Sequence, residues 1–185
     1  MRFLPTKVDG AWIVELEERG DDRGTFARVW CRREFAERGL ATEFVQGNTA
    51  VTRSQGTVRG MHLQLPPHGE AKLVRCLRGA VWDVVVDLRP DSPTYRKWEG
   101  VELTAENRRM LYLPEGCAHG YQALVDDTEV FYLVSAFYTP EAERGVRPED
   151  PALGVEWPLP VEGLSPKDGG WPDFDPAAPF SGAGP

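Results

Sequence analysis

Two histidines in glycine-flanked segments are the residues best suited to chemistry in this chain. The sequence holds only three histidines, and two of them, His62 in segment 59–64 and His119 in segment 114–120, lie beside strand-like runs. Imidazole gains and loses its proton near neutral pH. Polar side chains that point into a small β-barrel are conspicuous, because burying them without partners is costly. Two more such residues fall in or beside strand-like runs: Lys72 and Tyr132.

Short runs of β-forming residues, separated by turn signals, must position these side chains. Residues 80–87 alternate with period two, so that Val81, Asp83, Val85 and Asp87 share one face. Residues 130–138 are rich in β-branched and aromatic side chains. The pattern predicts a sandwich or closed barrel with one helix at 32–38. Further strands are expected at 42–47, 49–52, 72–77, 98–103 and 110–113.

Length and composition indicate one domain. A chain of 185 residues can bury a sizeable core, and its net charge of −8 argues against nucleic acid or an anionic membrane as the main partner. The opening residues lack the apolar stretch of a signal peptide, and no segment approaches a membrane span. Three cysteines without CxxC spacing fit reduced thiols. We therefore expect a cytoplasmic protein, with an irregular Pro- and Gly-rich tail from Ser165 onward.

A series of short motifs runs in order from about Asp21 to Asp168. They are Asp22-Arg23-Gly24-x-Phe26, Gln46-x-Asn48, Arg59-Gly60-x-His62-x-Gln64, Lys72-Leu73-Val74, Asp83-Val84-x-Val86-Asp87-Leu88-Arg89, Ser92-Pro93-Thr94-Tyr95, Pro114-x-Gly116-x-Ala118-His119-Gly120, Tyr132, Tyr138-x-Pro140-x-x-Glu143, Asp150-Pro151, Trp157-Pro158 and Ser165-x-Lys167-Asp168. This series resembles the dTDP-4-dehydrorhamnose 3,5-epimerase family. The resemblance implies a single domain over 1–185, with a core at about 21–168 and a tail at 169–185.

The resemblance also implies a fold and an activity. The fold is an all-β, cupin-like jelly-roll barrel of antiparallel strands with one or two short helices, usually in a homodimer. The activity is epimerisation at C3, C5 or both of a nucleotide-linked 4-keto-6-deoxyhexose, without a cofactor or a metal. Such a reaction needs a base, a group that holds the enolate oxygen and an acid on the opposite face.

Four residues match the catalytic positions of that family. His62 is the base, and Asp168 orients its ring and stabilises the imidazolium as a triad aspartate does. Lys72 is the electrophile for the enolate oxygen, and Tyr132 is the acid. The proximity of Asp168 to His62 is implied by the resemblance alone.

Ten further residues match substrate-binding positions: Arg23, Phe26, Arg28, Gln46, Asn48, Arg59, His119, Tyr138, Glu143 and Lys167. Guanidinium groups suit the diphosphate, and His119 is expected near the sugar. The resemblance also implies that a swapped N-terminal strand delivers Arg23 and Phe26 across the dimer. Arg28 departs from the family, which usually has an acidic residue there. A carboxylate accepts from N3–H of thymine and a guanidinium only donates, so we expect an altered base preference.

Simpler interpretations and other functions stay open at this point. Each polar residue, taken alone, could be structural, and His68 in a Pro-Pro-His-Gly segment is expected to be an exposed loop residue. The same catalytic set would serve an epimerase that inverts only C3 or only C5. A metal-dependent cupin could use His62, His119 and Glu70 as ligands, although Lys72 would place a positive charge beside the metal. A non-catalytic sugar-nucleotide binder would not need the full catalytic set.

Overall fold

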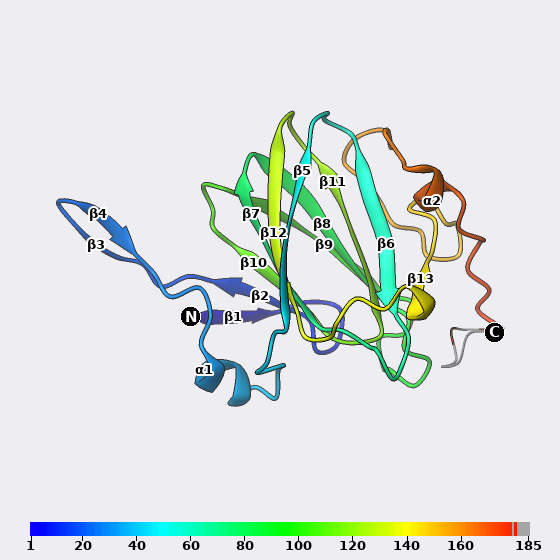
Figure 1. Ribbon diagram of the computed structural model, residues 1–185, viewed down its shortest axis with the longest axis horizontal. Coiled ribbons are helices and arrows are strands. Elements are labelled where there is room, and N and C mark those ends of the chain that lie inside the picture. Colours follow the sequence, from blue (N-terminus) through cyan, green and yellow to red (C-terminus); the bar gives the residue numbers. More distant parts are fainter. Residues whose placement is uncertain (179, 181–185) are drawn as a thin grey trace.

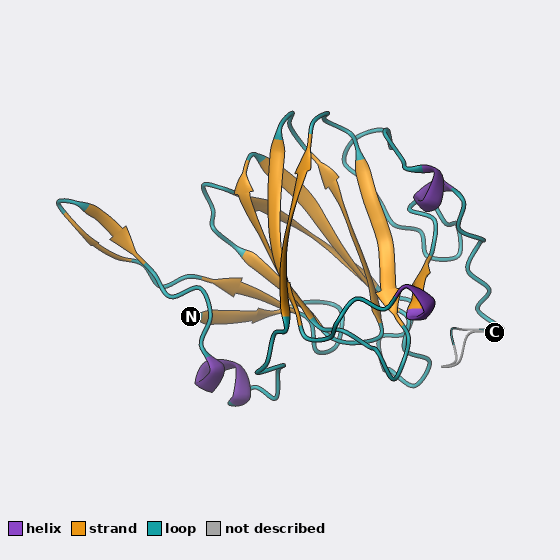
Figure 2. Ribbon diagram, in the orientation of Figure 1, coloured by secondary structure: helices purple, strands orange, loops and turns teal. Residues whose placement is uncertain are grey.

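Two antiparallel β-sheets form the barrel in the computed structural model, which describes residues 1–178 and 180 (Figures 1 and 2). In spatial order, the six-stranded sheet consists of β1 (Arg2–Pro5), β2 (Trp12–Glu15), β10 (Met110–Leu113), β7 (Lys72–Arg78), β12 (Thr128–Val134) and β5 (Gln46–Thr52). The five-stranded sheet consists of β13 (Glu143–Gly145), β6 (Val58–Gln64), β11 (Cys117–Ala123), β8 (Ala80–Asp87) and β9 (Trp98–Thr104). The predicted all-β, cupin-like fold is confirmed.

The core lies between the two sheets and follows the alternation of the strands. Val81 and Val85 of β8 pack there against Val74 of β7 and Leu111 of β10. Val84 and Val86, on the other face of β8, belong to a second apolar cluster, in which residues 146–174 cover the outer face of the five-stranded sheet. This alternation places Asp83 and Asp87 on the inward face, and both are fully buried.

Asp87 holds the turn after β8. Its carboxylate accepts hydrogen bonds from Arg89 Nε at 2.8 Å and from Thr94 Oγ1 at 2.6 Å, and it also accepts from Ser92. Burial alone would raise the pKa of Asp87, but these hydrogen bonds outweigh it and bring the pKa below its ordinary value. The Asp87–Arg89 and Ser92–Thr94 motifs therefore shape this turn.

Two short helices and an aromatic cluster complete the barrel. The first helix, α1 (Arg32–Ala36), buries Phe35 against Phe3, Trp30 and Tyr112. It ends two residues earlier than predicted. The second helix, α2 (Pro166–Gly169), interrupts a tail that was predicted to be irregular. Ser165 caps α2 by accepting from the backbone N–H of Asp168 at 3.0 Å, which explains a helix in so Pro- and Gly-rich a segment.

Some strand bounds also differ from those predicted. The segments expected at 42–47 and 49–52 form the single strand β5, which starts at Gln46. The strand expected at 130–138 is β12, and it ends at Val134 because the chain turns there toward the short 3₁₀-helix η1 (Pro140–Ala142). All three cysteines are free. Among the described residues, no helix is long and apolar enough to cross a membrane.

A small hairpin stands apart from both sheets. It consists of β3 (Arg19–Asp21) and β4 (Gly24–Phe26), which pair only with each other. Figure 1 shows it projecting to the left, away from the barrel. Phe26 at its end has 70% of its surface exposed, which is unusual for a large apolar side chain.

Candidate active site

A cavity of about 300 Å³ opens between the two sheets. It is lined by Gln46, Asn48, His62, Leu63, Gln64, Glu70, Lys72, Tyr132, Val134, Tyr138 and Glu143. Strand register explains the grouping, because paired residues on neighbouring strands share a face. Val134 of β12 pairs with both Gln46 and Lys72, and Tyr132 of the same strand pairs with Asn48.

His62 and Asp168 meet at the wall of this cavity. His62 Nε2 lies 2.6 Å from Asp168 Oδ1, and the backbone N–H of Gly60 donates to Asp168 Oδ2 at 3.4 Å. Asp168 retains only 5% of its surface exposed. Burial alone would raise the pKa of Asp168, but the hydrogen bond and charge of His62 outweigh it, so the pKa lies below its ordinary value. A charged Asp168 is thus placed to hold the imidazole ring.

The segment that carries Asp168 is anchored just after it. Asp150 is almost fully buried, and its two oxygens accept from the backbone N–H groups of Ala152 at 2.8 Å and of Phe174 at 2.6 Å. The ring of Trp171 lies on Gly145, where an added Cβ would come within 2.3 Å of it. Gly145 of β13 pairs with His62 of β6, so this contact lies directly behind the histidine.

Lys72 and Tyr132 lie on the six-stranded sheet, opposite His62. Lys72 is 8% exposed, and its Nζ lies 3.1 Å from Glu70 Oε1. Tyr132 packs partly against the core. Burial raises the pKa of Tyr132, and the charge of Glu70 raises it further against a smaller opposing effect of Arg59. Tyr132 therefore keeps its proton at neutral pH, as a proton donor must.

Glu143 connects two residues at the edge of the cavity. Its carboxylate accepts from the hydroxyl of Tyr138 at 2.8 Å and from Lys167 Nζ at 2.6 Å. Burial would raise the pKa of Glu143, but the bonds to Lys167 and Tyr138 lower it below its ordinary value. Lys167 precedes Asp168 on α2, so one short helix supplies two neighbouring parts of the site.

His119 and Arg59 lie beside the cavity. His119 Nε2 is 2.8 Å from Asp83 Oδ1, and both side chains are buried behind the lining residues. The other carboxylate oxygen of Asp83 is buried with no partner among the described residues. Arg59 donates from Nε to Thr52 Oγ1 and from Nη2 to the carbonyl of Val51, both at 3.1 Å.

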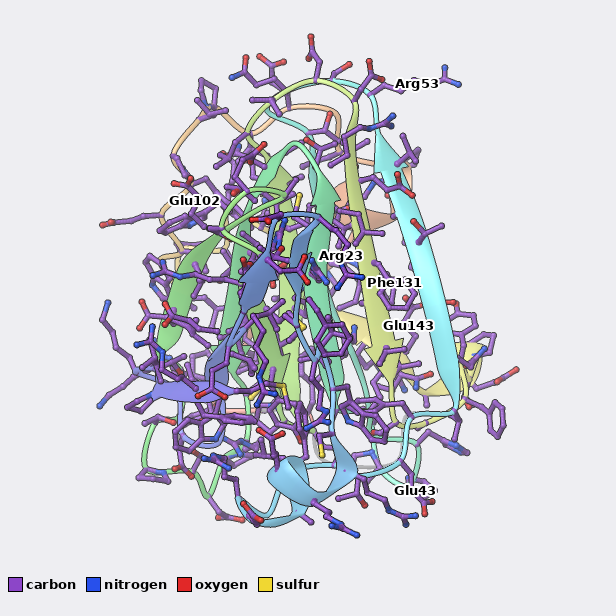
Figure 3. All side chains as sticks on the ribbon, turned by 90° about the vertical axis from the view of Figure 1, so that its left-hand side faces the viewer. Arg23, Glu43, Arg53, Glu102, Phe131 and Glu143 are labelled. Atoms are coloured by element: carbon purple, nitrogen blue, oxygen red, sulfur yellow. The ribbon has the colours of Figure 1, made fainter. Side chains whose placement is uncertain are left out.

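The three N-terminal candidates do not reach this cavity within one chain. Arg23 pairs with Asp21 at the tip of the hairpin, and Arg28 Nη1 lies 3.5 Å from Glu34 Oε1. Phe26 and Arg28 line a separate, small pocket. Figure 3 looks onto the side from which the hairpin projects and labels Arg23 on it.

The three residues considered as ligands of a metal cupin each pair with another side chain of the site. His62 bonds to Asp168, His119 bonds to Asp83, and Glu70 pairs with Lys72. In the part of the chain that the structure describes, no cluster of three or more His, Cys, Asp or Glu side chains is arranged to hold a metal ion.

Sequence reasoning missed several partners of the site. Asp83 was recognised only as sharing one face of its strand with Val81, Val85 and Asp87 and as part of a motif, and a buried carboxylate there signals a partner. Ser165 caps α2, but a helix of four residues is too short to be predicted from the sequence, so its cap was not recognised. Glu70 was considered only as a metal ligand, although its separation of two residues from Lys72 was visible in the sequence.

Fold and cavity together define the class: a cupin-like barrel whose cavity holds a histidine–aspartate pair opposite a lysine and a tyrosine. A family profile described as dTDP-4-dehydrorhamnose 3,5-epimerase matches residues 5–176. A relative of that name from Shigella flexneri is 43% identical over 169 residues, which cover 91% of this chain and 93% of that protein. A Streptomyces niveus relative named dTDP-4-dehydrorhamnose 3-epimerase is 45% identical, covering 91% of this chain and 81% of that protein.

A solved structure agrees with the sequence comparison. The crystal structure of dTDP-4-dehydrorhamnose 3,5-epimerase from Elizabethkingia anophelis has a TM-score of 0.91 and 40% identity, covering 94% of this chain and 96% of that one. The chain belongs to the dTDP-4-dehydrorhamnose 3,5-epimerase family of isomerases.

The anchoring of the tail by Asp150 gives a first prediction. Asp150→Asn should lose one of two buried hydrogen bonds and lower the free energy of unfolding by about 1–3 kcal/mol. Hydrogen exchange should quicken more for backbone amides of residues 165–174 than for those of β8, which exchange only through global unfolding. The control is Asp173→Asn, which removes an exposed ion pair with Arg147 and should cost less than about 1 kcal/mol. Equal effects of the two substitutions would contradict an anchoring role for Asp150.

Proposed function

We propose that this protein inverts C3, C5 or both of a dTDP-linked 4-keto-6-deoxyhexose in deoxysugar biosynthesis. The observation that carries the proposal is the His62–Asp168 pair at one wall of the cavity, with Lys72 and Tyr132 at the opposite wall. Among solved relatives, a Legionella pneumophila epimerase is described in complex with dTDP-4-keto-L-rhamnose. A 3'-monoepimerase from Streptomyces bikiniensis is described in complex with dTDP-quinovose.

The first step removes a proton next to the ketone. Because His62 Nε2 faces Asp168, the ring nitrogen left to accept the proton is Nδ1. The C–H bond breaks, its electron pair forms the enolate double bond, and negative charge collects on the C4 oxygen. Asp168 stabilises the imidazolium, and the ammonium of Lys72 stabilises the oxygen. Losing a preorganised donor of this kind costs about 10²–10³ in rate.

The second step returns a proton from the other face. Tyr132 gives its hydroxyl proton to the carbon, which inverts the centre and leaves a phenolate. Solvent then reprotonates Tyr132 and takes the proton from His62, which restores the starting state. Each inversion therefore exchanges one carbon-bound hydrogen with water.

The substrate also carries a nucleotide. Because the cavity has room for the sugar alone, the nucleotide must bind outside it. The hairpin presents an arginine and an exposed aromatic ring, which suit a diphosphate and a base. We infer a homodimer in which each hairpin reaches the cavity of the other copy. Two exposed apolar side chains of the six-stranded sheet, Val51 on β5 and Leu77 on β7, support such a contact.

Deuterium exchange tests the proposed reaction. Incubation with dTDP-4-keto-6-deoxyglucose in D₂O should introduce deuterium at C3 and C5, as followed by proton NMR. His62→Ala should abolish exchange at both carbons, because the base is gone. His68→Ala, which removes an exposed loop histidine, should exchange like the wild type.

The position of the label separates the related functions. Because relatives include both 3,5-epimerases and a 3-epimerase, label at one carbon would make this protein a mono-epimerase. Nucleotide binding with no label at either carbon would point to a non-catalytic binder.

Mixing two inactive variants tests the exchanged hairpin. A His62→Ala chain keeps its hairpin, and an Arg23→Ala/Phe26→Ala chain keeps its cavity. After subunit exchange, mixed dimers should hold one complete site, restoring about one quarter of wild-type activity at equal amounts. If each hairpin served its own cavity, the mixture would stay as inactive as its components.

Arg28 yields a prediction on the nucleotide base. Calorimetry should show that Arg28→Glu strengthens dTDP binding relative to the cytidine analogue by about tenfold or more, since a carboxylate accepts from N3–H of thymine. The wild type should prefer dTDP over the cytidine analogue less strongly than the Arg28→Glu variant does. Comparable dTDP affinity in both proteins, with no gain for another nucleotide, would refute an altered base preference.

A further inference from the structure

Glu70 is an acidic residue inside the cavity that the reaction as described does not use. It follows the turn after β6 and lines the same cavity as His62, Lys72 and Tyr132. Its Oε1 lies 3.1 Å from Lys72 Nζ, and its Oε2 accepts from Gln64 Nε2 at 3.3 Å. Both carboxylate oxygens therefore have a partner, one charged and one neutral.

Gln64 fixes the position of that carboxylate. Its side chain is 2% exposed, and Nε2 also faces the carbonyls of His68 at 3.1 Å and Phe137 at 3.2 Å. Its Oε1 accepts from the backbone N–H of Thr139 at 2.6 Å. The loops at 65–71 and 135–139 are thus joined through one buried amide. Glu70 is held on this rigid support before any substrate arrives.

A fixed carboxylate constrains Lys72. A free lysine side chain loses conformational entropy when it is ordered, and the pair with Glu70 already orders Lys72 in the folded protein. An ammonium has three N–H donors. When one N–H of Lys72 points at Glu70, the other two can point at an oxygen in the cavity. The ammonium is therefore oriented before the substrate binds.

The same carboxylate acts on Tyr132. A negative charge nearby disfavours the phenolate, and the charge of Glu70 contributes to the raised pKa of Tyr132. Several other titratable or charged groups surround this phenol on neighbouring elements: Lys72 on β7, Arg59 and His62 on β6, Tyr121 on β11, Glu143 on β13, and Tyr138. Among these, Glu143 is already paired with Lys167, whereas Glu70 adjoins Lys72 itself.

We propose that Glu70 is a positioning residue of the epimerase, which aims the ammonium of Lys72 into the cavity and supplies the negative charge beside Tyr132. The inference rests on the proposed function for its kinetic consequences, but its effect on Tyr132 can be measured without substrate. Removing the charge favours the phenolate and weakens the hold on the ammonium. The easier ionisation of Tyr132 moves the loss of activity at high pH toward lower pH.

The test compares three variants. Glu70→Gln removes the charge, Glu70→Asp keeps the charge on a shorter side chain, and Glu115→Gln removes a charge from an exposed glutamate beside Gly69. The phenolate absorbance of Tyr132 is followed against pH, with the same protein carrying Tyr132→Phe as the blank. The rate of the D₂O reaction is followed across the same pH range.

Glu70→Gln should lower kcat by about tenfold with KM nearly unchanged, since an orientation needed in the transition state is lost. Its Tyr132 should ionise at lower pH, and the alkaline limb of kcat should move the same way. Glu70→Asp should keep the wild-type titration of Tyr132 and lose part of kcat, and it serves if the glutamine variant fails to fold. Glu115→Gln should match the wild type.

Two results would overturn the proposal. One is a Glu70→Gln protein with wild-type kcat or an unmoved Tyr132 titration. The other is an equal shift in Glu115→Gln, which would reflect general charge. A wild type that titrates as expected but exchanges no deuterium would count against the proposed function, and the absorbance result would still decide the role of Glu70 beside Tyr132.

Discussion

The hydrogen bond between His62 and Asp168 is the contact on which the rest of the structure depends. It joins residues 106 positions apart, so the chain must complete both sheets and then return along the outside of the barrel. A buried carboxylate is tolerated only with partners. The carboxylate of Asp168 has His62 and the N–H of Gly60, and its backbone N–H is capped by Ser165. Asp150 and Trp171 hold the returning segment. The covering tail is therefore part of the site.

The same rule governs the other polar residues inside the barrel. Lys72 faces Glu70, His119 faces Asp83, and Lys167 faces Glu143. Each of these three side chains is matched by a carboxylate. Such pairs keep polar groups in fixed directions, and fixed dipoles and charges stabilise a developing enolate better than mobile ones. The barrel thus contributes rigidity to the chemistry, and its apolar core supplies that rigidity.

Local pattern was enough to predict much of the fold. Strict alternation in 80–87 and the apolar run at 110–113 reproduce β8 and β10 residue for residue, because these strands are buried and bounded by turns. Residue types also indicated His62 and Lys72. Asp168 could be placed only through resemblance, since pairing across 106 positions depends on how the tail returns. The His119–Asp83 pair depends on the register of β11 and β8, and the hairpin carries no signal of where it points.

The late position of Asp168 in the sequence has a consequence for how the protein matures. A ribosome makes every strand that the structure describes before it makes Asp168. Domains generally fold as units during synthesis, so the barrel's sheets are available for pairing while the histidine still lacks its carboxylate. The nascent protein accordingly passes from a folded but unreactive barrel to a reactive one in its last turn of helix.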